Sequence, residues 1–142
     1  MAFDAFLKIE GIEGDSLQKG HPGEIELSSF SWGETNPTNP ATGGGGGTGK
    51  VQMQDFHFSM ATSKASPQLH QFCASGQRVR EATLTCRKAG AEQFEFLKIK
   101  LTDVLISSYA VGGSSGDDNP GDQASMAFVK LDMTFFEQGP KG

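Results

Sequence analysis

The sequence predicts a mainly β protein: a closed or nearly closed barrel, or a sandwich, with one short helix and one long extended loop. Two observations support this fold class. Apolar and polar residues alternate along six segments, which is typical of strands with one buried face. Only one segment carries apolar residues at helical spacing, and turn-forming residues separate the others.

The expected strands cover residues 3–9, 24–33, 51–60, 80–88, a long run from residue 92 onward, and 124–136. In the second of these, Phe30 and Trp32 fall on one face. Ile25 and Leu27 fall on the opposite face, nearer the start of the strand. A strand with apolar groups on both sides, at different points along its length, predicts two different environments for its two ends.

Alternation in the later strands predicts which residues face the core and which face the solvent, and it predicts one irregularity. In 80–88 the inward residues are Ala82, Leu84 and Cys86, and the outward ones are Thr83, Thr85 and Arg87. In the last strand Val129, Leu131, Met133 and Phe135 alternate with Lys130, Asp132 and Thr134. The long run changes phase near Asp103, where Val104 and Ile106 take over from Ile99 and Leu101. Such a change predicts a bulge, or a strand that turns a corner.

The only expected helix covers residues 66–75. Ser66 suits the N-cap, Pro67 suits the first helical position, and Gly76 suits the residue after the helix. Its narrow apolar stripe consists of Leu69, Phe72 and Cys73. A helix of this length is marginal alone, so we expect it to pack on the sheet.

A glycine-rich segment, residues 35–49, is the long extended loop. It contains two Asn-Pro pairs and five consecutive glycines, which exclude a helix or a core strand. If it linked two domains, the first would have only about 34 residues, below the roughly 40 that fold without disulfides or metal. We therefore expect one domain over residues 1–142, with a second flexible loop at 112–123.

Charge and composition exclude several classes of function. The net charge is -5, and a chain without clustered Lys and Arg is a poor partner for nucleic acid. No apolar run approaches the roughly 20 residues that span a bilayer. The first residues lack a basic n-region, so we expect cytosolic synthesis and any export by a route without an N-terminal signal peptide. Cys73 and Cys86 are expected to be free thiols.

Three possible sites of chemistry fail on their context. Gly44–Lys50 matches a phosphate-loop spacing, but no buried strand precedes it, no helix follows it, and Val51 replaces the required Ser or Thr. The acidic residues of the second loop lack the spacing of a calcium loop and are expected to form a solvated turn; they are Asp117, Asp118 and Asp122. The three histidines do not form a ligand pair. Neither an enzyme nor a cofactor is expected.

Five stretches in order resemble the haemolysin-coregulated protein (Hcp) family, the tube subunit of bacterial type VI secretion. They are Phe6–Ile9 with Gly11–Ser16; Glu24-Ile25 with Phe30–Gly33; Gly43–Val51 with Gln54-Asp55; Ser66-Pro67 with Leu69 and Gly76; and Thr85–Gly90 with Val104–Tyr109. They cover nearly the whole chain. One departure is Phe30, where many relatives carry Trp.

The resemblance implies a two-sheet β-barrel that assembles into hexameric rings, which stack into a hollow tube. It implies partners among the spike and sheath components and effectors carried in the pore, with no catalytic activity and no cofactor. A phage or phage-like tail tube protein and, in another class, a monomeric β-barrel that binds a small ligand remain alternatives.

Two groups of residues are the candidate sites. Ser29 and Ser31 lie opposite Phe30 and Trp32, so we expect them to line the pore and contact effectors. Ordering the long loop costs roughly 15–30 kcal/mol of backbone entropy, so we expect it to need contacts beyond its own domain, at a subunit or ring-stacking interface. The residues assigned to that interface are Asn36, Pro37, Asn39, Pro40, Gly43, Gly44, Gly45, Gly46, Gly47 and Lys50.

Overall fold

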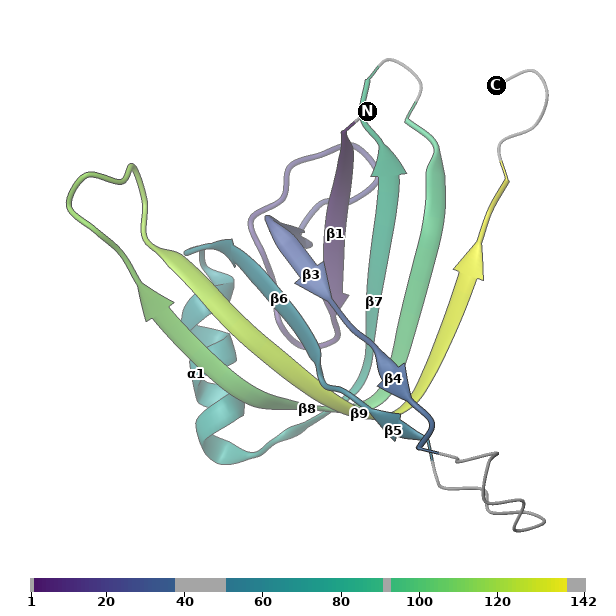
Figure 1. Cartoon of the computed structure of the whole chain (residues 1–142). Coiled ribbons are helices and arrows are strands. Elements are labelled where there is room, and N and C mark those ends of the chain that lie inside the picture. Colours follow the sequence, from purple (N-terminus) through teal and green to yellow (C-terminus); the bar gives the residue numbers. More distant parts are fainter. Residues whose placement is uncertain (1, 38–50, 91–92, 138–142) are drawn as a thin grey trace, which may run out of the picture.

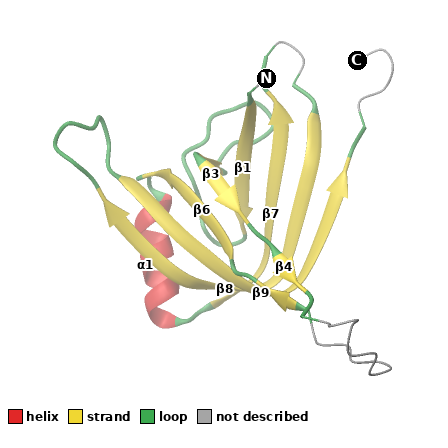
Figure 2. Cartoon of the chain, in the orientation of Figure 1, coloured by secondary structure: helices red, strands yellow, loops and turns green. Residues whose placement is uncertain are grey.

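A seven-stranded antiparallel sheet, curled into a nearly closed barrel, makes up most of the molecule (Figures 1 and 2). The computed structural model describes residues 2–37, 51–90 and 93–137. Its elements are β1 (Phe3–Ile9), β2 (Ile25–Leu27), β3 (Ser29–Ser31), β4 (Glu34–Thr35), β5 (Gln52–Met53), β6 (Phe56–Ala61), α1 (Ala65–Ser75), β7 (Arg78–Lys88), β8 (Glu95–Gly112) and β9 (Gly121–Phe135). The predicted class, mainly β and barrel-like with one helix, is confirmed.

The strand order explains how the barrel closes. It runs β2-β1-β7-β8-β9-β6-β3, and β4 pairs with β5 in a separate two-stranded ribbon. Strands β2 and β3 stand at opposite ends of this order, yet only Ser28 separates them in the chain. The Ser28 N–H donates to the Ser59 carbonyl at 2.8 Å, which ties the junction to β6.

The second predicted strand is therefore divided, and its two environments are real. Ile25 and Leu27 point into the core, whereas Ser29 and Ser31, at the same parity, are exposed. The inward side of the chain switches at Ser28, where the chain leaves one edge of the sheet and joins the other. The predicted strand at 51–60 is also divided, into β5 of the ribbon and β6 of the barrel.

The phase change in β8 is confirmed and has a backbone cause. Leu101 and Val104 are both buried although three positions apart, and Asp103 between them has a φ of 58°. A second irregularity shifts the register of β8 against β9 between Ile106 and Ser108. These two points let β8 turn a corner, so the two sheets expected from the resemblance form one continuous hydrogen-bonded sheet.

Helix α1 lies behind β8 and β9 in Figure 1 and packs Ala65 and Leu69 into the core. Gly76 has a φ of 70°, and its N–H donates to the Phe72 carbonyl at 3.1 Å, as a C-terminal glycine should. The predicted N-cap is wrong: Lys64 occupies it, and Ser66 lies within the first turn.

The Ser66 side chain bonds to strand β9 instead of capping the helix. Its hydroxyl donates to the Asp122 carboxylate, which also accepts from Thr62 at 2.7 Å and from Tyr109 at 3.0 Å. Asp122 is buried on β9, so its placement in a solvated acidic turn is wrong, and the second loop is confined to residues 113–120. Burial also raises the pKa of the Tyr109 hydroxyl.

Candidate functional site: a neutral serine face

One outer face of the barrel is polar but almost without charge. It covers a depression of about 370 Å³ over β3, β6, β9 and the end of β8. We call it the serine face; its exposed or half-buried polar and small residues are Ser29, Ser31, His57, Ser59, Ser108, Ala110 and Gln123. His57 is the only titratable side chain among the residues that line the depression.

The strand register brings these residues together. Ser29 pairs with Ser59 and Ser31 pairs with His57 across β3 and β6. Gln123 lies beyond Ser59 on β9 and pairs with Ala110 of β8. Because each of these residues points away from the core, the alternation that buries Phe56, Phe58 and Met60 also assembles the serine face.

Hydroxyl groups on this face bond mainly to one another. The Ser29 and Ser59 hydroxyls share a hydrogen bond. Ser125 lies buried beside the depression and bonds to the hydroxyls of Ser107 and Ser108, and Ser107 also donates to Asp55 at 2.6 Å. The sheet is therefore polar toward the solvent, and several of its hydroxyl groups bond to one another within the chain.

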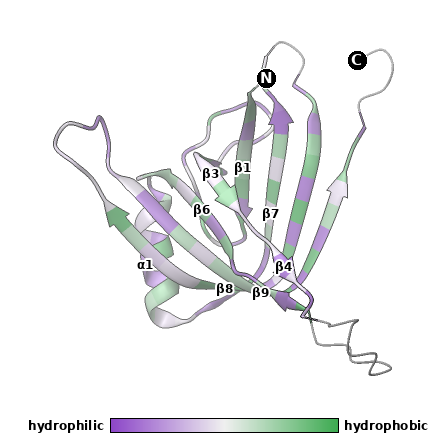
Figure 3. Ribbon diagram, in the orientation of Figure 1, coloured by the Kyte–Doolittle hydropathy of each residue, from purple (hydrophilic) through white to green (hydrophobic). Residues whose placement is uncertain are grey.

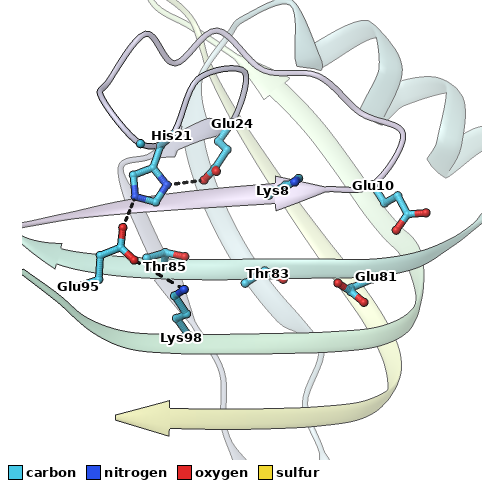
Figure 4. Close-up of a pocket in the computed structure, with 10 residues that line it drawn as sticks. Lys8, Glu10, His21, Glu24, Glu81, Thr83, Thr85, Glu95 and Lys98 are labelled. Carbon is cyan, nitrogen blue, oxygen red and sulfur yellow. Dashed lines mark hydrogen bonds and ion pairs between the residues drawn. The ribbon is translucent and has the colours of Figure 1, made fainter. Parts of the chain in front are cut away.

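A second outer face, over β1, β7 and the first half of β8, has the opposite character. We call it the charged face; it carries Lys8, Glu10, Glu81, Glu95 and Lys98 around a depression of about 510 Å³ (Figure 4), with Lys100 beside Glu81. Several of its charges are paired: Lys100 lies 3.4 Å from Glu81, and Arg80 lies 3.1 Å from Glu10. Figure 3 shows the alternation of hydrophilic and hydrophobic residues along β7 and β8 that produces this face.

The loop between β1 and β2 covers part of the charged face and buries a small side-chain cluster that the sequence did not predict. The Phe6 ring is fully buried between the His21 ring, stacked at 4.4 Å, and the Arg87 guanidinium at 4.7 Å. Arg87 does point outward, as predicted, but it is only 3% exposed, because it donates to the Lys19 carbonyl and the Gln18 side chain in the loop. The signal was Phe6 itself, an aromatic residue on the expected polar face of β1.

His21 fixes the other side of the same loop. Its two ring nitrogens lie 2.9 Å from a Glu24 carboxylate oxygen and 2.8 Å from a Glu95 carboxylate oxygen (Figure 4). These contacts join the loop to β2 and to the start of β8. The cluster stabilises the fold, because its stacked rings and most of its polar groups have partners within the chain; the Arg87 Nε is buried without a hydrogen bond and lies 3.6 Å from the Asp4 carboxylate.

The structure describes some of the predicted site residues and not others. Ser29 and Ser31 lie side by side on the serine face, as two of its exposed members. Asn36 and Pro37 are exposed just beyond β4. The other residues assigned to an interface lie outside the described residues: Asn39, Pro40, Gly43, Gly44, Gly45, Gly46, Gly47 and Lys50.

Reactive groups offer no alternative site in the part of the chain that the structure describes. Cys73 and Cys86 are free thiols, as predicted, and burial raises the pKa of Cys86 to about 11. Within the described ranges, no group of three His, Cys, Asp or Glu side chains could hold a metal ion. None of the helical residues described forms a span long and apolar enough to cross a bilayer.

Fold and surface together define a class: a barrel-like β protein whose most distinctive surface is a neutral sheet face. Comparisons with known proteins identify the family. The family model described as type VI secretion system effector, Hcp, matches residues 6–135. Protein hcp1 of Pseudomonas aeruginosa is 40% identical over 143 residues, which covers all of this chain and 88% of that protein.

Solved structures agree with the family match. Hcp1 from Salmonella typhimurium superposes with a TM-score of 0.83 at 30% identity, over 98% of this chain and 89% of the other. A type VI secretion system effector from Yersinia pestis gives a TM-score of 0.80 at 31% identity, over 95% of this chain and 92% of the other. The chain therefore belongs to the Hcp family of type VI secretion, which is a structural family and not a known family of enzymes.

Proposed function

We propose that this chain is a structural subunit of a type VI secretion tube, assembling into rings that stack and carry effectors in their pore. The serine face is the observation that carries the proposal. A pore through which different proteins pass needs a wetted wall with little fixed charge, because strong ion pairs would hold or exclude cargo according to its sign. The serine face is polar and carries one titratable group.

The edges of the same sheet support ring assembly. Within the described chain, β3 is the last strand on one side and pairs only with β6. At the opposite border of the serine face, pairing of β8 with β7 ends at Leu105, so in the described chain the β8 edge from Ile106 to Gly112 pairs with β9 alone. Two different open edges favour head-to-tail contacts between copies, and such contacts form closed rings when the rotation closes.

The assembled state would define the partners and the location of the protein. Sixfold rings, as the family resemblance implies, would meet spike and sheath components of the secretion machine and enclose effectors. The chain would be made in the bacterial cytoplasm without a signal peptide and exported by that machine. The glycine-rich segment from Asn36 to Lys50 would contact neighbouring copies at the interface between subunits or between rings.

Ring formation is tested by mass-calibrated size-exclusion chromatography and negative-stain imaging. The expected result is a particle of about six times the 15.1 kDa chain mass with a central hole. A chain that stays a 15.1 kDa monomer at high concentration would contradict the proposal. Shortening Gly43–Gly47 should weaken assembly, while circular dichroism still reports a folded barrel.

The pore assignment is tested separately with Ser31→Gln. A longer side chain on an exposed position of β3 should leave the ring intact and change the retention of effectors in a co-purification assay. Thr83→Gln, an equivalent change on the charged face, is the matched control and should leave retention unchanged. Equal retention by both variants, across several effectors, would contradict the proposal that Ser31 lines the pore.

A further inference from the structure

His21, in the loop that joins β1 to β2, lies between two carboxylates. Its Nδ1 is 2.9 Å from the Glu24 Oε1, and its Nε2 is 2.8 Å from the Glu95 Oε2 (Figure 4). The His21 side chain is only 6% exposed, so water cannot readily replace either partner. The two contacts fasten this end of the loop to β8.

This arrangement needs one proton beyond those of a neutral imidazole and two ionised carboxylates. A neutral ring donates from one nitrogen and accepts at the other, whereas an ionised carboxylate only accepts. With a neutral ring, one of the two short contacts would place a nitrogen lone pair against a carboxylate oxygen in a buried site, which costs free energy. A ring protonated on both nitrogens donates to both carboxylates.

Charged groups surround His21 on every element packed against it. Glu95 is shared, because its other oxygen, Oε1, lies 3.7 Å from the Lys98 Nζ on the same strand. Farther along the depression lie Glu10 and Glu81. The remaining charged groups are Lys8 on β1, Lys19 in the loop, and Arg87 on β7 with its partner Asp4. Among these described groups, the two that contact the ring through a charge are Glu24 and Glu95.

We propose that His21 is a proton-operated latch that holds the β1–β2 loop closed over the charged face. With both ring nitrogens protonated, His21 ties the loop to β8 through Glu95. When the ring loses a proton, that contact breaks. Glu95 is the partner given up, because it is 38% exposed and keeps Lys98, whereas Glu24 is 15% exposed and follows His21 by three residues in the same loop.

A second anchor limits how far the loop opens. Arg87 donates to the Lys19 carbonyl and the Gln18 side chain, and a guanidinium stays protonated throughout the range in which histidine titrates. The loop therefore stays attached at residues 18–19 and opens at residues 20–24, which exposes the Phe6 ring.

The direction of the pH dependence follows from the extra proton. The closed loop binds it more tightly than the open loop, so closure is favoured at low pH and is lost as the pH rises through about 5 to 8. Every group involved lies within one chain, so the inference does not rest on ring assembly.

Hydrogen–deuterium exchange read by mass spectrometry, over about pH 5 to 8 and corrected for the intrinsic pH dependence of exchange, tests the latch. The amides of His21 and Gly23, which hydrogen-bond within the loop, should lose at least tenfold in protection toward high pH. Protection in α1 should not change, which separates loop opening from global unfolding. Equal loop protection at both ends of the range, or an equal loss in α1, would overturn the proposal.

Glu95→Gln tests the role of the extra proton. A glutamine side chain can donate to a neutral ring nitrogen or accept from a protonated one, so the contact survives deprotonation of His21. Loop protection should then be the same at both ends of the pH range. Glu81→Gln is the matched control, because Glu81 pairs with Lys100 on the same face, and it should keep the pH dependence of the parent. A Glu95→Gln variant with the parent's pH dependence would contradict the latch.

Nitrogen-15 spectra of histidine-labelled protein read the ring without a change at the site, and decide the question if Glu95→Gln does not fold. The His21 signals are assigned by elimination with His57→Gln and His70→Gln, because both of these residues are exposed. Both His21 ring nitrogens should be protonated at low pH, and the loss of one proton should follow the same pH curve as loop exchange. A His21 ring that is neutral throughout the range would overturn the proposal.

Discussion

The serine face and the charged face share the long strand β8, yet they have different chemistry and different supports. Strand β8 turns from one face to the other between Asp103 and Ser108. The charged face lies under a loop that is held by Phe6, His21 and Arg87. The serine face is supported from inside by α1, through Ser66 and Asp122.

This difference shows where each half can tolerate change. Ion pairs on the charged face are largely solvent-exposed, so each contributes little to stability. They do keep a long strand surface soluble and discourage unwanted edge pairing. The serine face has no such charges, but its Ser108 hydroxyl bonds to the buried Ser125. Disturbing what lies beneath each face should therefore have the largest effects.

The largest effect is expected from Phe6→Ala. Removing a fully buried ring between His21 and Arg87 should lower the free energy of unfolding by about 3–5 kcal/mol, measured by urea denaturation. Phe6→Leu, which keeps most of the apolar volume, should lose much less. A loss below about 1 kcal/mol for Phe6→Ala would show that the loop does not depend on this cluster.

The corresponding change beneath the serine face is Asp122→Asn. The amide keeps the shape of the side chain but loses the charge that accepts hydrogen bonds from Thr62, Ser66 and Tyr109. We expect a loss of about 1–3 kcal/mol in the free energy of unfolding. Asp117→Asn, in the exposed loop that precedes β9, is the control and should change stability by less than about 0.5 kcal/mol.

The two thiols report on the two halves separately. Cys86 is buried in β7, and its pKa of about 11 leaves on the order of one thiol in a thousand ionised at pH 8. The half-buried Cys73 on α1 should therefore react with iodoacetamide more than tenfold faster, as read by mass spectrometry after proteolysis. Phe6→Ala should raise the rate at Cys86 and leave Cys73 unchanged; equal acceleration would mean that the halves open together.

The same raised pKa has a consequence for stability. The folded chain favours the neutral Cys86 thiol, so this contribution is fully present below pH 9, the ordinary pKa of the group, and is lost as the pH rises toward 11. The free energy of unfolding, measured by urea denaturation, should therefore fall between pH 9 and pH 11.

The smallest effect is expected from Glu10→Gln on the charged face. Its partner Arg80 is exposed, and the pair should contribute no more than about 1 kcal/mol, falling with added salt. Urea denaturation at low and high salt checks this. A loss of several kcal/mol in the free energy of unfolding would show that the exposed ion pairs of the charged face do support the fold.

Alternation along the chain was enough to predict the fold class, the single helix and the phase change at Asp103, because each depends on neighbouring residues. What it could not predict depends on distant partners. Ser66 suits an N-cap by its type, but Asp122, far along the chain, takes its hydroxyl. Arg87 alternates outward as predicted, yet a loop closes over it.

The same distinction between local pattern and distant partners applies to the candidate site. Alternation placed Ser29 and Ser31 on an outward face, but their meeting with Gln123 and Ala110 follows from strand order, which local pattern does not contain. In the last strand, regular alternation to Phe135 correctly predicts two faces. It does not predict that the apolar face is exposed, because that exposure depends on where β6 ends.

The junction at Ser28 also limits when the barrel can be completed during synthesis. It commits the N-terminal part of the chain to both ends of the sheet, since β2 pairs with β1 and β3 pairs with β6. Among the described strands, β6 in turn joins the rest of the sheet only through β9, which follows it by about 60 residues. Synthesis must therefore pass β9 before the seam can close. The strands on both sides of that seam therefore reach their final pairing together, at a late stage of synthesis.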